Sequence, residues 1–289
     1  MSFSVMTDTS ANLPEEFIEK NGVKCIPYSF LVDGEEPDGG PFDGKSFYDG
    51  MRGGKIVTTS QISPQRYSDF FRSELEAGRD LLFVSMSSGI SGSFNSASIA
   101  AEDLRAEFPD RKLRLVDALG ASLGQGLLVI WALRCRELGM DADETAELLN
   151  DRRFGVCQVF TVDDLRYLKR GGRLSNLAAA VGTVLQIKPL LKGDGEGRIV
   201  CFEKLRGRKR AIEAMAESFR KHALDRPRMT VGVAHADCES DADSLIAMLR
   251  AIRDDLEVIK VCYEPVTGSH VGPGTLALFF DGSREFRFA

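Results

Sequence analysis

The sequence predicts an α/β protein with a parallel-sheet N-terminal domain and a smaller α+β C-terminal domain. Short apolar runs alternate with segments of helical periodicity through residues 1–155, and parallel neighbours need crossovers of this kind. From residue 156 onward, some strands follow one another directly, joined by a glycine-rich turn. We therefore expect an α/β domain over residues 1–155 and an α+β domain over residues 156–289.

The composition excludes several classes of protein. A chain of 289 residues with 43% hydrophobic residues can bury sizeable cores, and its net charge of −6 disfavours binding to nucleic acid or an anionic membrane. The most apolar helical stretch, residues 127–133, is too short to cross a bilayer, so we expect no stable membrane insertion. The six cysteines have no Cys-x-x-Cys spacing and no leader follows Met1, which indicates reduced thiols in a cytoplasmic protein.

The expected elements of the first domain follow from apolar periodicity and helix-start signals. Strands are predicted at residues 3–6, 23–32, 81–84 and 113–117, and helices at 14–20, 45–51, 64–77, from about 97, at 121–138 and at 143–151. The helix over 64–77 has the clearest start, because Ser63 is a good N-cap and Pro64 suits the first helical position. This start places Thr59 and Ser60 in the loop before the helix.

The second domain mixes hairpins with helices. Strands are predicted at residues 157–161, 185–191, 198–203, 230–235, 258–263 and 276–280, and helices at 163–168, 176–184, 209–223 and 241–252. The glycine-rich residues 193–197 join two strands and are not followed by Gly-Lys-Ser/Thr or by a helix. They predict a hairpin turn and not a phosphate-binding loop.

Polar residues gather where the predicted parallel strands end, the edge at which such sheets bind ligands. These residues are Asp8, Thr9, Ser10, Thr59, Ser87, Ser88, Ser91 and Asp117. The richest stretch, residues 85–97, turns from strand to helix, so its serines either cap free helix amides or contact a ligand oxygen. The convergence of several such ends favours a ligand site.

The three histidines differ in their prospects. We expect His222 to be solvated and His235 to make a structural hydrogen bond, whereas His270 lies in the predicted loop over residues 267–275 and is a candidate site residue. A serine-dependent acyl hydrolase or transferase using Ser91 and His270 is the alternative function. A nucleophile elbow needs glycine two residues after the serine, but Ser93 stands there.

The histidines and cysteines also lack metal-ligand spacing, so no metal site is predicted. Two basic segments, residues 169–173 and 204–210, are either solvated surface or a docking and phosphate-binding surface, since arginine forms a fork for anions.

Taken in order, six motifs make the chain resemble the DegV family of bacterial fatty-acid-binding proteins, including the FakB-type subunits of fatty acid kinase. They are TDTSANLP (7–14), TSQISP (59–64), SSGISGSFNSA (87–97), LKRGGRLS (168–175), IKP (187–189) and HVGPGT (270–275). The pattern departs from the family's at Ile62, Ser93 and residues 117–120, and it keeps Thr59, Ser91 and His270.

The resemblance implies a lipid carrier that is not itself an enzyme, with no catalytic residues and with a bound long-chain fatty acid in place of a cofactor. The carboxylate is expected near the domain junction on Thr59 and Ser91, with His270 in the same network and Ser60, Ser88 and Ser93 as supporting polar residues. A fatty acid kinase catalytic subunit is the expected partner, which makes acyl-phosphate for phospholipid synthesis. Arg170, Arg173 and Arg206 are expected to form the surface where that partner and the phosphate meet the carrier.

Overall fold

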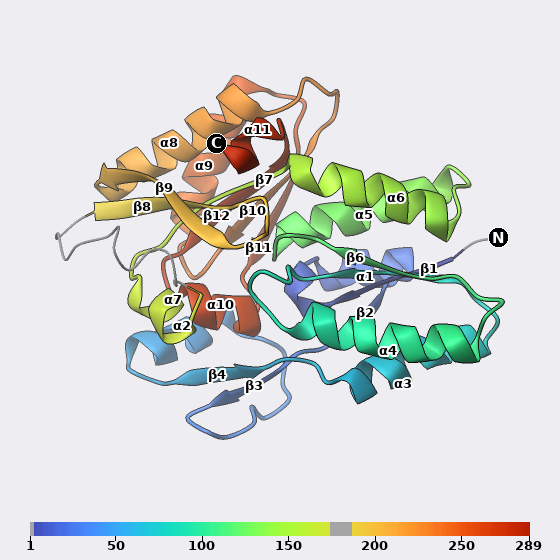
Figure 1. Cartoon of the computed structure of the whole chain (residues 1–289). Helices are drawn as coiled ribbons and strands as arrows, with labels where there is room; N and C mark the ends of the chain where they lie inside the picture. The colour runs from blue at the N-terminus through green and yellow to red at the C-terminus, as the bar shows by residue number, and fades with distance from the viewer. Residues whose placement is uncertain (1–2, 174–186) are drawn as a thin grey trace. The chain divides into compact units, whose positions relative to one another are not determined.

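The computed structural model describes residues 3–173 and 187–289 (Figure 1). The chain groups into two compact units, Met1–Ser29 with Ser60–Phe154, and Phe30–Thr59 with Gly155–Ala289. The predicted boundary between residues 155 and 156 would place residues 30–59 in the first domain. In the structure this segment packs with the second unit.

The first unit is built on a parallel sheet with strand order β2-β1-β5-β6. Its strands are β1 (Ser4–Asp8), β2 (Lys24–Ile26), β5 (Leu81–Ser85) and β6 (Leu113–Asp117). Helices α5 (Leu123–Glu137) and α6 (Ala142–Arg152) lie on one face and α3 (Pro64–Glu76) and α4 (Ser93–Glu107) on the other (Figure 1). The short elements η1 (Thr9–Ala11) and α1 (Glu15–Asn21) follow β1. The predicted parallel α/β architecture is confirmed.

The core of this unit forms because apolar side chains on strands and helices face each other. All five residues of β5 are buried, as expected for a strand covered on both faces. Tyr67 and Phe71 of α3 pack on Phe83 of β5 with ring centroids 5.4 and 5.2 Å away. Helix α3 begins as predicted, with Pro64 in its first turn and the Ser63 hydroxyl accepting from Arg66 N at 3.3 Å.

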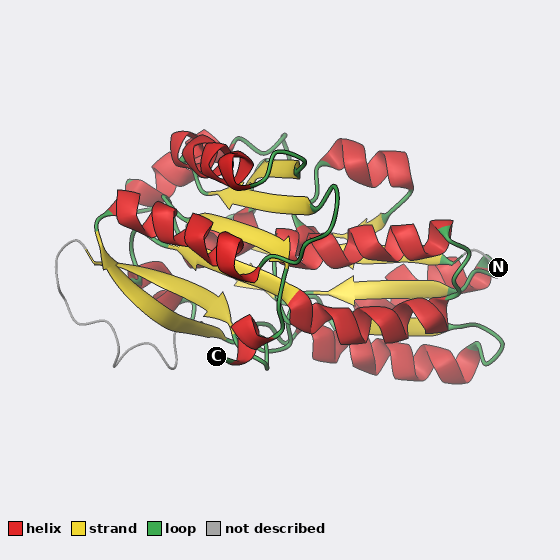
Figure 2. Ribbon diagram, turned by 90° about the horizontal axis from the view of Figure 1, so that it is seen from above, coloured by secondary structure: helices red, strands yellow, loops and turns green. Residues whose placement is uncertain are grey.

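The second unit contains a six-stranded mixed sheet with order β11-β10-β12-β7-β8-β9. Its strands are β7 (Val156–Thr161), β8 (Ile187–Gly193), β9 (Ile199–Arg206), β10 (Thr230–His235), β11 (Glu257–Cys262) and β12 (Leu276–Asp281). Only the β10–β11 pair among these is parallel. Helices α8 (Arg208–His222) and α9 (Glu239–Ile252) bury their apolar faces on this sheet, and Figure 2 shows helices flanking the strands.

The predicted glycine-rich hairpin is confirmed. Strands β8 and β9 pair antiparallel from Ile187 opposite Arg206 to Gly193 opposite Ile199. The Asp194 carboxylate closes the turn because Oδ1 accepts from the backbone nitrogens of Glu196 and Arg198, both at 2.9 Å.

Smaller elements complete the described fold. They are β3 (Ser29–Val32), which pairs with β4 (Val57–Ser60), α2 (Gly44–Arg52), η2 (Arg153–Gly155), α7 (Arg166–Arg170), α10 (Pro265–Val271) and α11 (Glu285–Phe288). Within the described residues, no helix combines the length and apolarity needed to span a membrane.

Three local predictions were wrong, and a fourth cannot be compared. Residues 23–32 form two short strands and not one, and Thr59 and Ser60 end a strand and do not lie in a loop. Helix α10 replaces part of the loop expected at 267–275, because Pro265 stands in its first turn and the Glu264 carboxylate accepts from two of its first amides. The helix predicted at 176–184 lies outside the described residues.

The buried central strand gives a stability prediction. Leu82→Ala on β5, where the leucine is 0% exposed, is expected to lower the free energy of unfolding by about 2–5 kcal/mol, because the surrounding core cannot fill the cavity. The matched control is Leu138→Ala, since Leu138 is 82% exposed and its loss leaves no cavity. Urea denaturation of both variants checks this, and equal midpoints would contradict the buried position of β5.

Candidate functional site

A first polar group lies at the carboxyl ends of β1, β5 and β6. Asp8, at the end of β1, is fully buried, and burial raises the pKa of its carboxyl group. Its oxygens accept from Gln125 Nε2 at 3.1 Å, from Met86 N at 3.3 Å and from Ser10. Asp8 therefore fixes the backbone that leaves β5 and does not face a ligand.

The serine-rich turn after β5 is held by backbone and side-chain hydrogen bonds. Asp117 Oδ1, at the end of β6, accepts from Ser88 N at 3.1 Å, and Ser91 Oγ accepts from Ser93 N at 3.2 Å. Ser93 Oγ in turn accepts from Ile62 N at 3.3 Å. Ser88 is exposed, Ser91 is half-buried and Ser93 is buried. Since a hydroxyl can accept and donate at once, Ser91 can still donate its proton to a ligand oxygen.

Gln61 is a positioning residue that the sequence analysis missed. A Cβ atom at position 92 would lie 2.2 Å from Gln61 Oε1, so only glycine allows this side chain to rest on the turn. Gln61 Nε2 also donates to Ser96 Oγ at 3.4 Å, on the first turns of α4. The signal available in the sequence was the adjacency of Gln61 to Thr59 and Ser60 in one motif.

The second polar group lies in the second unit and joins Thr59 to His270. Thr59 Oγ1 lies 2.9 Å from His270 Nε2, which binds the end of β4 to the last turn of α10. Both side chains are half-buried. When Nε2 carries the ring proton it donates to Thr59 Oγ1 and leaves the threonine proton for an anionic oxygen.

His270 is neutral near pH 7. Burial, followed by the positive charges of Arg173 and Arg170, lowers the pKa of its imidazole from the ordinary 6.5 to about 4. A Cβ atom on residue 171 would lie 2.3 Å from His270 Nδ1, so Gly171 gives the ring its space. The structure thus brings Arg170, Arg173 and Gly171 of one motif to the histidine of another.

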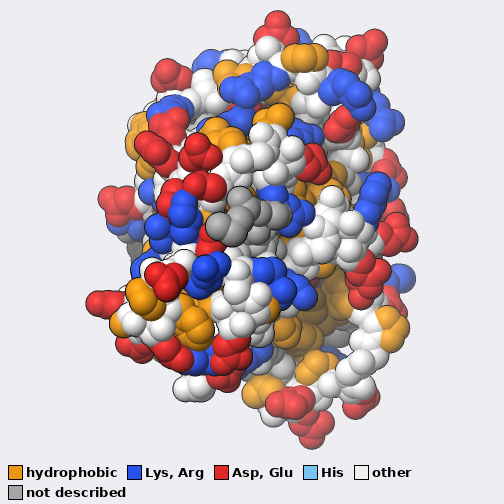
Figure 3. Space-filling view, turned by 90° about the vertical axis from the view of Figure 1, so that its right-hand side faces the viewer, with side chains coloured by type: hydrophobic (Ala, Val, Ile, Leu, Met, Phe, Trp, Pro, Cys, Tyr) orange, Lys and Arg blue, Asp and Glu red, His pale blue; other side chains and the backbone are white. Residues whose placement is uncertain are grey.

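The remaining predicted residues lie in different surroundings. Ser60 is exposed, and so is Arg206 at the end of β9. Arg170 is exposed and packs its guanidinium over the Tyr167 ring at 5.1 Å, while Arg173 donates to Gly171 O. Figure 3 shows that Lys and Arg side chains are interspersed with Asp and Glu on the face it presents.

The other two histidines occupy structural positions. His222 was expected to be solvated, but it is half-buried, and the centroid of its ring lies 4.8 Å from that of Phe286. His235 is buried, and its Nδ1 has no hydrogen-bond partner within the described residues, so the structural bond expected there is absent at that nitrogen. Neither imidazole is placed among the predicted site residues of its own unit.

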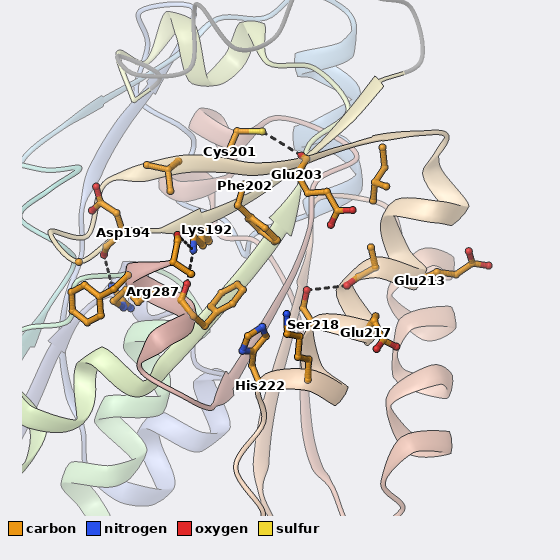
Figure 4. A pocket seen from close by; sticks show the side chains of 18 of the residues that line it. Lys192, Asp194, Cys201, Phe202, Glu203, Glu213, Glu217, Ser218, His222 and Arg287 are labelled. Atoms are coloured by element: carbon orange, nitrogen blue, oxygen red, sulfur yellow. Dashed lines mark hydrogen bonds between the residues drawn. The ribbon is translucent and has the colours of Figure 1, made fainter.

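The second unit also has a groove of about 1440 Å³ between the β8–β9 hairpin, α8 and α11 (Figure 4). None of the predicted site residues lines it, and five carboxylates do: Asp194, Glu196, Glu203, Glu213 and Glu217. Two of its four lining cations are buried and already used by carbonyls: Lys192 Nζ donates to Phe286 O at 2.5 Å and Ala289 O at 2.8 Å, and Arg287 donates to Asp194 O at 3.1 Å and Val156 O at 3.0 Å. Arg210 and Lys221 also line the groove, but its carboxylates outnumber these two cations, which disfavours an anionic head group.

The described part of the chain holds no cluster of three or more histidine, cysteine or acidic residues arranged for a metal ion. The first polar group offers serine hydroxyls as hydrogen-bond donors, and the second offers the Thr59 hydroxyl beside a neutral imidazole. Such donors bind an anionic oxygen.

Residues 2–282 match the model of a protein family that is described as uncharacterised proteins of the DegV family. The chain belongs to the DegV family. A DegV domain-containing protein of Clostridium perfringens is 34% identical over 286 residues, which cover 98% of this chain and 98% of that protein. The resemblance that the six motifs predict is confirmed.

Solved structures of DegV-family proteins share the fold. A Thermus thermophilus protein described by its fatty acid binding has a TM-score of 0.87 and 30% identity, covering 98% of this chain and 100% of its own. DegV of Bacillus subtilis, described as a fatty acid binding protein, has a TM-score of 0.86 and 30% identity with the same coverage. DegV-fold relatives of this chain thus bind fatty acids.

The low pKa of His270 predicts a pH-dependent loss of stability. The free imidazole titrates at 6.5 and the folded one at about 4, so the unfolded chain binds more protons between these values. The free energy of unfolding is expected to fall as the pH drops from about 6.5 to about 4. His270→Gln removes this titration and should show a shallower decline in urea midpoints over the same range. Parallel declines in the two proteins would contradict a buried, neutral His270.

Proposed function

We propose that this DegV-family chain binds one long-chain fatty acid through a carboxylate held by the hydroxyls of Thr59 and Ser91, with His270 in the same polar network. The observation that carries the proposal is the 2.9 Å bond between Thr59 Oγ1 and His270 Nε2. A neutral imidazole there orients a hydroxyl donor. The relatives described as binding fatty acids support the class of ligand.

The acyl tail and the carboxylate of the fatty acid make different contributions to the free energy of binding. Each buried methylene contributes about 0.8 kcal/mol, so a sixteen-carbon tail gains on the order of 10 kcal/mol before ordering costs. A carboxylate withdrawn from water costs many kcal/mol unless it is hydrogen-bonded. The tail therefore supplies affinity, and the hydroxyls make burial of the head group tolerable. Ser60, Ser88 and Ser93 are proposed as supporting polar residues.

We also propose that the chain presents its fatty acid to an ATP-dependent kinase that phosphorylates the carboxylate. Arg170, Arg173 and Arg206 are the proposed surface for this partner, since guanidinium groups suit carboxylates and phosphates. The exposure of Arg170 supports this role. All six cysteines are free thiols, which supports a cytoplasmic location.

The first test is native mass spectrometry of the protein purified from cells, with extraction and identification of the bound molecule. A fatty acid is expected in about one copy per chain. Thr59→Ala with Ser91→Ala is expected to remove it, because the carboxylate loses two charge-assisted donors. The control is Ser244→Ala, whose hydroxyl donates within α9 to Ser240 O at 2.8 Å.

The outcomes separate the carrier from the hydrolase alternative. An empty wild-type protein that takes up no added fatty acid would contradict the carrier function. Hydrolysis of short acyl esters that disappears in Ser91→Ala would instead support a serine hydrolase. No such turnover is expected, because His270 Nε2 is bonded to Thr59 and residue 93 is not the glycine of a nucleophile elbow.

The second test addresses the arginine surface. Arg170→Glu is expected to lower acyl-phosphate formation at least about tenfold with a fatty acid kinase catalytic subunit and ATP, because like charges oppose docking. Lipid binding should be unchanged at pH 8, where His270 is neutral. Arg250→Glu, an exposed arginine on α9, is the matched control. Loss of lipid binding in Arg170→Glu would place this arginine at the head group and not at the partner surface.

A further inference from the structure

Two buried tyrosines of the first unit are held rigidly by their surroundings. Tyr67 on α3 is 0% exposed, and its ring stacks on Phe71 with centroids 5.6 Å apart. Tyr28, between β2 and β3, is 8% exposed, and its backbone nitrogen donates to Thr9 Oγ1 at 3.1 Å. Neither phenol can turn toward water without disturbing this packing.

Both phenol hydroxyls lack a hydrogen-bond partner within the described residues. Native proteins rarely leave a buried hydroxyl unpaired, because the free-energy cost of removing it from water is then not offset by a hydrogen bond. Burial raises the pKa of both tyrosines above the ordinary range, so each is a neutral O–H group able to donate. Two such donors in one place indicate a missing acceptor.

The acceptor they lack belongs beside the serine-rich turn. The hydroxyl of Ser93 lies near both phenols, that of Ser91 lies near Tyr28, and the two phenols lie near each other, so that weak hydrogen-bonding effects partly offset the rise of both pKa values on burial. None of these pairs has the distance and angles of a full hydrogen bond. The serine oxygens accept elsewhere, from Ile62 N at 3.3 Å and Ser93 N at 3.2 Å.

Asp8 also lies near enough to raise the pKa of both tyrosines. Its oxygens are already used by Ser10, Gln125 and Met86 N. The nearest protein acceptors are therefore occupied, and four O–H groups gather where an external oxygen could satisfy them.

We propose that the hydroxyls of Tyr28 and Tyr67 are further ligands of the fatty-acid carboxylate, donating to the head group beside Ser91 and Ser93. This inference rests on the proposed function, since it takes the fatty acid as the ligand. A carboxylate has two oxygens with about four acceptor positions, enough for phenol and serine donors together. Neutral phenols suit an anion without adding a buried cation.

The test measures binding of hexadecanoic acid and of its methyl ester to lipid-stripped wild-type, Tyr28→Phe and Tyr67→Phe proteins. Each variant is expected to bind the acid about tenfold more weakly, because a hydrogen bond to a charged group is lost. Affinity for the ester should change less than about twofold. The melting temperature of the stripped variants should stay the same or rise, since each loses an unpaired buried hydroxyl.

The matched control is Tyr48→Phe in the second unit, because the Tyr48 hydroxyl donates to Tyr263 O at 2.9 Å. It is expected to lower the melting temperature of the stripped protein and to leave the acid-to-ester ratio unchanged.

Three results would overturn the inference. Wild-type affinity for the acid in both Phe variants would show that the phenols do not reach the head group. Equal losses for acid and ester would place them along the acyl chain. A lower melting temperature in the stripped variants would show that the hydroxyls already have a structural partner, such as a buried water. Failure of wild-type protein to bind the acid at all would contradict the proposed function itself.

Discussion

Parallel pairing of β1, β5 and β6 is the constraint on which the first polar group depends. In such a sheet each chain must leave its strand at the same edge, so the ends of these strands bring Asp8, the serine-rich turn and Asp117 together. The buried carboxylates are satisfied by backbone and side-chain donors around them, which fixes the turn. The scaffold that holds Ser91 therefore uses its acids internally, and donation by the Ser91 hydroxyl to a ligand is the proposed role.

The two units would supply donors to the proposed carboxylate by different means. In the first, the donors are serine and tyrosine hydroxyls near a helix start; in the second, a threonine is oriented by a neutral histidine. Neither group depends on a buried cation. Such a cation would be left buried and unpaired, at a large desolvation cost, whenever the ligand dissociates. Positive charge near the second group comes from half-buried Arg173 and exposed Arg170.

Much of the fold could be predicted from the sequence because its signals are local. Buried β5, the Ser63-Pro64 start of α3 and the Asp194 turn each depend on residues within a few positions, and all are found in the structure. Helix α10 was missed because its glycines suggest a loop, whereas packing of Gly268 against the Tyr48 hydroxyl depends on tertiary contacts.

The site was predictable only in part, for the same reason. The motifs pointed to Thr59 and His270, and the structure brings these two together. Ser91 lies with Ser93 as expected from their adjacency, but their role toward a ligand stays a prediction. The tyrosines gave no signal, because a buried phenol with a partner and one without look the same in a sequence. The packing of residues 30–59 with the second unit was equally invisible, since it depends on contacts across more than a hundred residues.

The close approach of His270 to Gly171 constrains how this sequence can evolve. With the imidazole in place, even alanine at residue 171 would clash with Nδ1. Replacement of the histidine by a smaller side chain would lift that restriction, so the two positions are epistatic and the order of substitutions matters. During evolution the histidine can be lost first and the glycine afterwards. The histidine can then return only after the glycine has been restored.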